Sequence, residues 1–357
     1  MKTYFKDLIL SLASIPSESG KEEAVLRFIG DYLSRLRIPY RLQEVPGCSP
    51  NLYVSFSEQP ELLLATHVDT VPLSLGLFPP KAEEDRLFGV GVCDAKAGVA
   101  LLMVLAERLV AEGLKPPVAL AFLVDEENEG RGSAKLAEEY RFPYAVVLEP
   151  TSLTVAIAEG GSVEFEVEVR GRSVHGSLAY RGANAIERAI ELIGELKRLS
   201  FLYEEHPLVG PAGLNIEKFS GGDGLLRVPE KAELELEFRI LPGQDLKGII
   251  ADIEAVLNRY TWVSYRIKDI SEAFYVDKNS RIVVALERAI GKALCKEAIL
   301  SGMPSWTDAA HLAAAGTQAV VFGPGDLTLC HTPEETISLS EVEEAFAVLW
   351  ELVKSFS

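Results

Sequence analysis

The sequence predicts an α/β protein: a mostly parallel sheet with helices on both faces, interrupted by an inserted α+β domain. Three observations predict this class. Over residues 1–159, nearly continuous apolar strands alternate with helices, which is the pattern of a parallel sheet buried on both faces. Residues 160–271 change to strands in which apolar and charged residues alternate. The buried pattern returns over residues 272–357, so the middle segment is expected to be a domain inserted into the first.

The elements of the first domain follow from the spacing of its apolar residues. Apolar residues three or four apart predict helices, and short unbroken apolar runs predict buried strands. The first expected helix opens with Ser19 and Glu22 at the spacing of a capping box. The helices are expected at 19–36, 95–113, 133–140, 281–294, 307–316 and 339–356, and the strands at 51–56, 61–66, 116–125, 144–150 and 318–325.

The inserted segment follows the order strand, helix, strand, strand, helix, strand. In its first strand, apolar residues at 163, 165, 167 and 169 alternate with charged ones, which predicts an antiparallel strand with one exposed face. The six elements are expected at 162–171, 183–199, 213–222, 232–241, 246–260 and 261–269. This order is that of a split βαβ, ferredoxin-like domain.

Composition excludes some classes of function. The net charge of −18, from 53 acidic and 35 basic residues among 357, argues against nucleic acid as a partner. Residues 1–17 resemble a weak signal peptide, but Asp7 interrupts the apolar run, and no stretch is long enough to span a membrane. The cysteines are scattered, which argues against disulfides and favours a cytoplasmic location: Cys48, Cys93, Cys295 and Cys330.

Metal-ligating side chains stand where the apolar strands of the first domain are expected to end. In open α/β sheets, ligands bind at the carboxyl ends of the strands. Imidazoles together with carboxylates suit zinc, cobalt or manganese. The set contains two histidines, one aspartate in a glycine-rich loop and three glutamates: His67, Asp94, Glu126, Glu127, Glu149 and His331.

The size of this set predicts two metal ions rather than one. If one glutamate serves as a base, five ligands remain, which are too many for one tetrahedral zinc with an open position. They suit two zinc ions if one carboxylate bridges them and a water completes both shells.

Each piece also has an ordinary structural interpretation. A histidine at a strand end is often only hydrogen-bonded, residues 125–130 are typical of a solvated turn, and Glu149 before Pro150 can simply end a strand. Residues 89–94 nearly match a dinucleotide-binding fingerprint, but Asp94 replaces its last glycine. Six such residues at one sheet edge favour a metal site. The absence of GxSxG and HExxH motifs argues against a serine hydrolase and excludes a single-zinc HExxH protease.

Six stretches of the chain resemble the di-zinc amidohydrolases, the family of acetylornithine deacetylase, succinyl-diaminopimelate desuccinylase, aminoacylase and carboxypeptidase G. The similarity covers nearly the whole chain in the family's order, the inserted domain included. The stretches are "ATHVDTVP", "FGVGVCDAKAG", "VDEENEGRGS", "VLEPT", "GRSVHGS…GANAIERA" and "FGPGDLTLCHTPEE".

The resemblance implies a role for each residue of the set. His67 and Glu149 would bind the first zinc, with Asp69 orienting the His67 imidazole. Glu127 and His331 would bind the second zinc. Asp94 would bridge the two ions, and Glu126 would be the general base. The implied reaction is removal of the acyl group from an N-acyl amino acid by a zinc-bridging hydroxide; the alternative is a carboxypeptidase or dipeptidase on the same scaffold, and a non-catalytic metal-binding relative is a further possibility.

The resemblance also implies roles in the inserted domain, which would serve as a lid and dimerisation domain of a homodimer. His175 would donate to the oxyanion across the dimer, and Arg239 would contact a substrate carboxylate; a surface histidine and a strand arginine in an ion pair are the ordinary interpretations. Asp308 stands at the family's aspartate position in a loop on the substrate side. The chain departs from the family at Leu226, where an asparagine is usual; two smaller departures are Ala97 for glycine and Cys330 for alanine.

Overall fold

The computed structural model describes residues 1–356 and divides the chain into two compact units. Unit 1 contains Met1–Ile157, Val276–Met303 and the chain from Thr307 onward, and unit 2 contains Ala158–Tyr275 and Pro304–Trp306. The sequence placed residues 304–306 in the first domain, whereas in the structure they group with unit 2.

Unit 1 is built on a mixed sheet with the order β1-β2-β6-β3-β7-β17-β8 and with β16 paired to β8. The centre of the sheet is parallel: β3 pairs with β6 and β7, and β7 pairs with β17. The edges are antiparallel, so the predicted class of a largely parallel α/β sheet is confirmed. The strands are β1 (Arg41–Gln43), β2 (Asn51–Ser55), β3 (Leu62–His67), β6 (Val118–Leu123), β7 (Tyr144–Val147), β8 (Val155–Glu159), β16 (Leu300–Met303) and β17 (Gln318–Val321).

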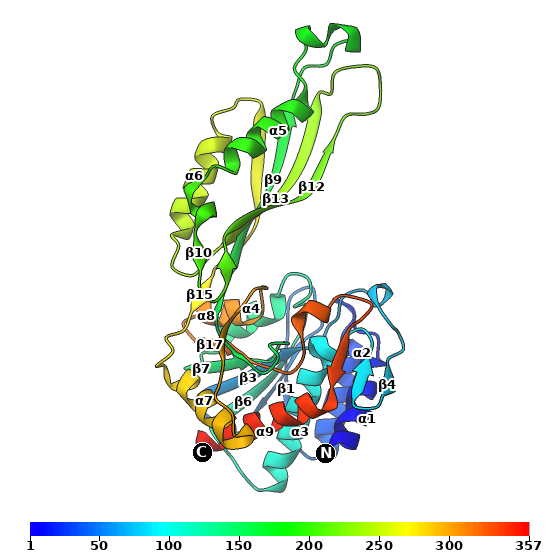
Figure 1. The fold of residues 1–357 in the computed structure, drawn as a ribbon. Helices are drawn as coiled ribbons and strands as arrows, with labels where there is room; N and C mark the ends of the chain where they lie inside the picture. The colour runs from blue at the N-terminus through cyan, green and yellow to red at the C-terminus, as the bar shows by residue number, and fades with distance from the viewer. Residues whose placement is uncertain (357) are drawn as a thin grey trace. The chain divides into compact units, whose positions relative to one another are not determined.

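Helices cover both faces of this sheet (Figure 1). α1, α2, α3, α7 and α9 pack against one another on one face, and α4 packs against α8 on the other. Every residue of β3 and β6 is buried, as expected for strands covered on both sides. The helices are α1 (Lys2–Ala13), α2 (Glu23–Arg35), α3 (Ala97–Ala111), α4 (Arg131–Glu139), α7 (Arg281–Leu294), α8 (Ala309–Ala314) and α9 (Leu339–Ser355).

A smaller sheet in unit 1 has the order β18-β5-β4. It joins β4 (Lys81–Glu83) and β5 (Arg86–Phe88) to β18 (Thr336–Ser338), which lies some 250 residues later in the chain. The spacing of apolar residues did not predict these short strands, because each has only three residues. The sheet matters for the site, since it holds the loop that follows His331 beside the loop that precedes Asp94.

The predicted capping box at the start of α2 is wrong. The helix begins at Glu23, and the Ser19 hydroxyl donates instead to Asp69 Oδ2 at 2.8 Å. A turn in which Lys21 N donates to Glu18 O delays the start of the helix. Ser19 is therefore recruited by a buried carboxylate far along the chain rather than by its own helix.

Unit 2 is an antiparallel sheet with the order β12-β13-β9-β14, with α5 and α6 on one face. Its core contains Phe165 and Phe238, which are fully buried and make an edge-to-face contact with ring centroids 5.8 Å apart. The elements are β9 (Gly161–Arg170), α5 (Ala185–Leu196), β12 (Gly213–Gly221), β13 (Lys231–Ile240), α6 (Leu246–Leu257) and β14 (Val263–Ser271), with short strands β10 (Glu205–His206), β11 (Gly210–Pro211) and β15 (Phe274–Tyr275).

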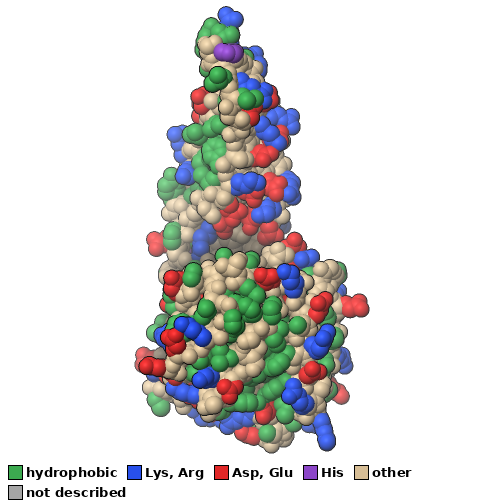
Figure 2. Space-filling view, turned by 90° about the vertical axis from the view of Figure 1, so that its right-hand side faces the viewer, with side chains coloured by type: hydrophobic (Ala, Val, Ile, Leu, Met, Phe, Trp, Pro, Cys, Tyr) green, Lys and Arg blue, Asp and Glu red, His purple; other side chains and the backbone are tan. Residues whose placement is uncertain are grey.

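The other face of the unit 2 sheet carries acidic and basic side chains close together (Figure 2). Cross-strand ion pairs join them: Arg266 to Glu166 at 2.5 Å and Lys218 to Glu235 at 2.8 Å. The alternation of apolar and charged residues thus separates a packed face from a solvated one. Across the described residues of both units, the helices are all too short or too polar to cross a membrane.

Candidate metal centre

The central parallel strands bring the predicted ligands to one edge of the unit 1 sheet. β3 ends at His67, β6 is followed by Glu126 and Glu127, and β7 is followed by Glu149. The loop after β17 leads to His331. Because parallel strands share one direction, the residues that follow them meet at the same edge.

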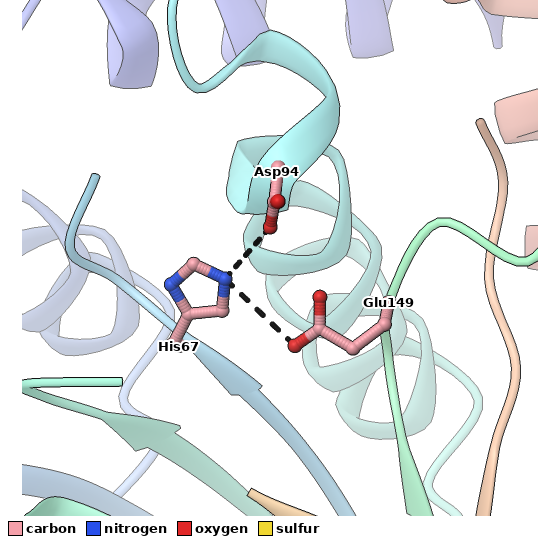
Figure 3. A group of neighbouring side chains, drawn as sticks. All are labelled: His67, Asp94 and Glu149. Atoms are coloured by element: carbon pink, nitrogen blue, oxygen red, sulfur yellow. Dashed lines mark hydrogen bonds and ion pairs between the residues drawn. The ribbon is translucent and has the colours of Figure 1, made fainter. Parts of the chain in front are cut away.

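The first group of candidate ligands is buried and consists of His67, Asp94 and Glu149 (Figure 3). His67 Nε2 lies 3.0 Å from Asp94 Oδ1 and 3.8 Å from Glu149 Oε1. The exposed fractions are 1%, 7% and 5%, and Glu149 Oε1 has no hydrogen-bond partner among the described residues. A buried carboxylate oxygen without a donor is costly, and a cation is the partner it lacks.

A second group shares Asp94 with the first and adds Glu127 and His331. His331 Nε2 lies 3.0 Å from Glu127 Oε1 and 3.3 Å from Asp94 Oδ2. Oδ1 of Asp94 thus faces the first group while Oδ2 faces the second. One carboxylate between two sets of candidate ligands could be shared by two neighbouring cations.

Asp69 organises the site from behind. Its Oδ1 lies 3.4 Å from His67 Nδ1 and accepts a hydrogen bond from Glu126 N at 3.2 Å. Its Oδ2 accepts from Ser19 Oγ and from Glu127 N at 3.0 Å. One fully buried carboxylate therefore orients an imidazole and also fixes the main chain of both glutamates.

Asp125 shapes the turn that carries Glu126 and Glu127, and the sequence analysis did not identify it. Its φ of 67° lies in the left-handed region, which aspartate tolerates better than most residues. Its carboxylate accepts from Arg131 Nε at 2.7 Å and from the second Arg131 nitrogen at 3.0 Å, and its main-chain oxygen accepts from Gly130 N. The only signal in the sequence was an acidic residue at the end of an apolar run.

The electrostatics of the site show a shortage of positive charge. Desolvation and the neighbouring carboxylates raise the pKa of Glu126 and of Glu149 well above the usual range. Burial opposes protonation of His67, but the surrounding carboxylates outweigh it and raise its pKa. Hydrogen bonds to Asp94 and Glu127 raise the pKa of His331 to about 10. Divalent cations fit this donor set, because they supply the charge and replace the protons.

Lys96 is a fully buried cation to which the sequence pattern alone gave no role. Its Nζ donates to Ser17 Oγ at 2.6 Å and to the carbonyl of Val68, between His67 and Asp69. Burial lowers the pKa of Lys96 to about 8. Lys96 therefore holds the chain just after β3 in place. In the sequence, only its position two residues after Asp94 pointed to this residue.

His175 and Arg239 belong to unit 2. His175 is exposed, and its Nδ1 accepts from Ser177 N at 3.2 Å, which leaves Nε2 as the ring nitrogen that carries hydrogen. Arg239 is partly buried and donates to Val209 O at 3.3 Å, while its Nε is buried without a partner among the described residues. Leu226 is 86% exposed. In unit 1, Asp308 is fully buried, and burial raises its pKa to about 7.

The fold and the site together define a metal-dependent hydrolase with a parallel-sheet catalytic unit and a second α+β unit. The sequence pattern of peptidase family M20/M25/M40 matches residues 63–355, and the chain belongs to this family. A curated relative is the [LysW]-lysine/[LysW]-ornithine hydrolase of Sulfurisphaera tokodaii, which is 30% identical over 340 residues, 94% of this chain and 91% of the relative.

Solved structures share the fold at lower sequence identity. Aminopeptidase PepT from Bacillus cereus has a TM-score of 0.84 and 18% identity, covering 100% of this chain and 99% of that one. The metallo-carboxypeptidase Sso-CP2 from Sulfolobus solfataricus has a TM-score of 0.81 and 16% identity, covering 99% of both chains. The protein is therefore a hydrolase of a metal-dependent family.

Proposed function

We propose that the protein hydrolyses the amide bond of an N-acyl amino acid and that two zinc ions bind at the two groups of ligands. The observation that carries this proposal is Asp94, whose two oxygens face His67 and His331 at 3.0 and 3.3 Å. His67 and Glu149 would hold one ion, and Glu127 and His331 the other. The donor set would also accept Co²⁺ or Mn²⁺.

Glu126 is proposed as the general base. When bound, two such cations polarise a substrate carbonyl and lower the pKa of a water between them. A carboxylate oxygen of Glu126 lies within 4.8 Å of the candidate ligand atoms of His67 and Glu127, while its backbone N–H is held by Asp69. At this place the carboxylate would accept the proton of the attacking water and then return it to the leaving amine.

His175 and Arg239 are proposed to act on the substrate from unit 2. The Nε2–H of His175 is exposed and would donate to the developing oxyanion in the active site of a second subunit. Arg239 has an unpartnered buried Nε, which a substrate carboxylate would satisfy. The proposed action of His175 requires a homodimer, with unit 2 as lid and dimerisation domain.

The substrate panel follows from the relatives. The curated relative is named for [LysW]-lysine and [LysW]-ornithine, so Nα- and Nε-acylated lysine and Nα- and Nδ-acylated ornithine are tested first. Acetylornithine, succinylated amino acids and dipeptides are compared with them, because peptidases share the fold. Hydrolysis of dipeptides alone would replace the deacylase proposal by the peptidase alternative.

The test of the mechanism uses Glu126→Gln and His175→Ala. Glu126→Gln is expected to keep its metal content and lose about 10²- to 10⁴-fold in kcat, the usual contribution of a general base. Mixing the two inactive variants is expected to restore part of the activity, because one active site of a mixed dimer then has both residues. Near-normal turnover of Glu126→Gln rejects the base, and no recovery in verified mixed dimers rejects action across the interface.

A further inference from the structure

The loop that supplies His331 also contacts the main chain of Asp94. His331 Nε2 lies 3.3 Å from Asp94 Oδ2. Four residues later, Glu335 Oε1 accepts hydrogen bonds from Cys93 N at 3.1 Å and from Asp94 N at 3.2 Å. One loop therefore touches the shared carboxylate residue at its side chain and at its backbone.

Glu335 is itself held rigidly in place. It is 2% exposed, its main-chain oxygen accepts from Gly89 N at 3.1 Å, and its own N–H donates to Thr332 O. The next residue begins β18, which pairs with β5. The small sheet fixes both the 331–335 loop and the chain that leads to Asp94. The position of the Glu335 carboxylate relative to the backbone of Asp94 is therefore fixed as well.

A charged acceptor at this place needs an explanation. A neutral carbonyl would satisfy the N–H groups of Cys93 and Asp94, and a buried carboxylate beside Asp94 is repelled by it. A carboxylate makes stronger and shorter hydrogen bonds than a neutral acceptor does, so a glutamate at this position holds the backbone of Asp94 more firmly. The repulsion between the two carboxylates is a cost that cations bound at the two groups would offset.

We propose that Glu335 is a positioning residue for the shared carboxylate: it fixes the backbone of Asp94 so that Oδ1 and Oδ2 face the two ligand groups at once. Its effect is on the simultaneous binding of two ions. This inference rests on the proposed function only in taking Asp94 as a ligand shared by two cations, and it requires no particular substrate.

The test measures cobalt binding without any substrate. Co²⁺ is titrated into metal-free wild type, Glu335→Gln and Glu335→Ala against a competing chelator, and the visible absorption of bound Co²⁺ reports coordination. Glu335→Ala is expected to bind the second ion about 10- to 100-fold more weakly, the usual effect of losing a partner behind a metal ligand. Glu335→Gln keeps an oxygen acceptor and is expected to lose less.

Glu341 supplies the matched control. Its Oε1 accepts from Gly325 N at 2.9 Å, so it too is a carboxylate that satisfies a backbone N–H in unit 1, but this bond does not reach a metal ligand. Glu341→Ala is expected to leave both cobalt affinities unchanged, even where its unfolding midpoint falls. Circular dichroism shows whether each variant folds. If Glu335→Ala does not fold, the cobalt affinity of Glu335→Gln tests the proposal.

Two results overturn the proposal: second-ion affinity within twofold of wild type in both folded Glu335 variants, or an equal loss in Glu341→Ala, which would mean general loosening. Wild-type protein that binds two ions but hydrolyses no substrate would reject the proposed function and leave this inference standing. Wild-type protein that binds fewer than two ions would reject both.

Discussion

Asp69→Asn tests the reasoning about the site most directly. Asp69 Oδ1 faces His67 Nδ1 and Glu126 N, while Oδ2 accepts from Ser19 Oγ and Glu127 N. Asparagine keeps one oxygen and replaces the other by an NH₂ donor. Whichever way the amide turns, one buried backbone N–H of the two glutamates then faces a donor.

The magnitude follows from this count. One buried N–H without an acceptor costs about 1–3 kcal/mol of folding free energy. The Ser19 hydroxyl can rotate and accept instead, so it adds little. Weaker support of His67 is expected to reduce metal affinity by about 10- to 100-fold, or about 1.4–2.8 kcal/mol at 1.4 kcal/mol per tenfold.

Two assays separate these effects. Urea unfolding of metal-free protein gives the change in folding free energy, and zinc competition with a chromophoric chelator gives the change in metal affinity. The control is Asp277→Asn, because Asp277 accepts from Asn279 N at 2.7 Å in an exposed turn away from the ligands. If Asp69→Asn matches wild type in both assays, Asp69 does not organise the site and its proposed support of His67 is rejected.

Three further predictions follow from the same structure. At pH 7, zinc binding is expected to release protons, one of them from His331, because its pKa of about 10 leaves it protonated without metal; zinc affinity therefore falls as pH is lowered, and calorimetry in buffers of different ionisation enthalpy measures the total release. Zinc at 100 times its Kd is expected to stabilise unit 1 by about 2.7 kcal/mol for each ion bound, and an unfolding midpoint independent of zinc contradicts a folded-state site. Phe165→Ala is expected to destabilise unit 2 by about 3–5 kcal/mol while leaving zinc affinity intact, which unfolding and zinc titration of the same sample check.

Much of the site could be predicted from strand ends. The runs that end before His67, Glu126 and Glu149 are apolar, short and separated by helices. Such strands lie parallel, and parallel strands place whatever follows them at one edge. The structure brings these side chains together for that reason, and the class of fold was predictable from the same pattern.

Local patterns were less reliable where a distant partner competes. Ser19 and Glu22 have capping-box spacing, yet Ser19 donates to Asp69, fifty residues away. The short strands β4, β5 and β18 were also missed, since three residues give too little periodicity to recognise and their pairing joins segments far apart in the chain. Propensity describes a segment alone, and these contacts depend on what lies beside it.

The sequence by itself determined the ligand types, their order and the sheet edge at which they meet, because strand direction and side-chain chemistry are local properties. Only the tertiary structure decided which distant residues hold the backbone of this set in place. Glu126 and Glu127 are adjacent in the chain; the left-handed Asp125 shapes the turn that carries them, and Asp69 accepts hydrogen bonds from both of their backbone N–H groups. The hydrogen bond from Asp94 N to Glu335 likewise joins residues 241 positions apart in the chain. A contact of that separation exists only once the chain has folded.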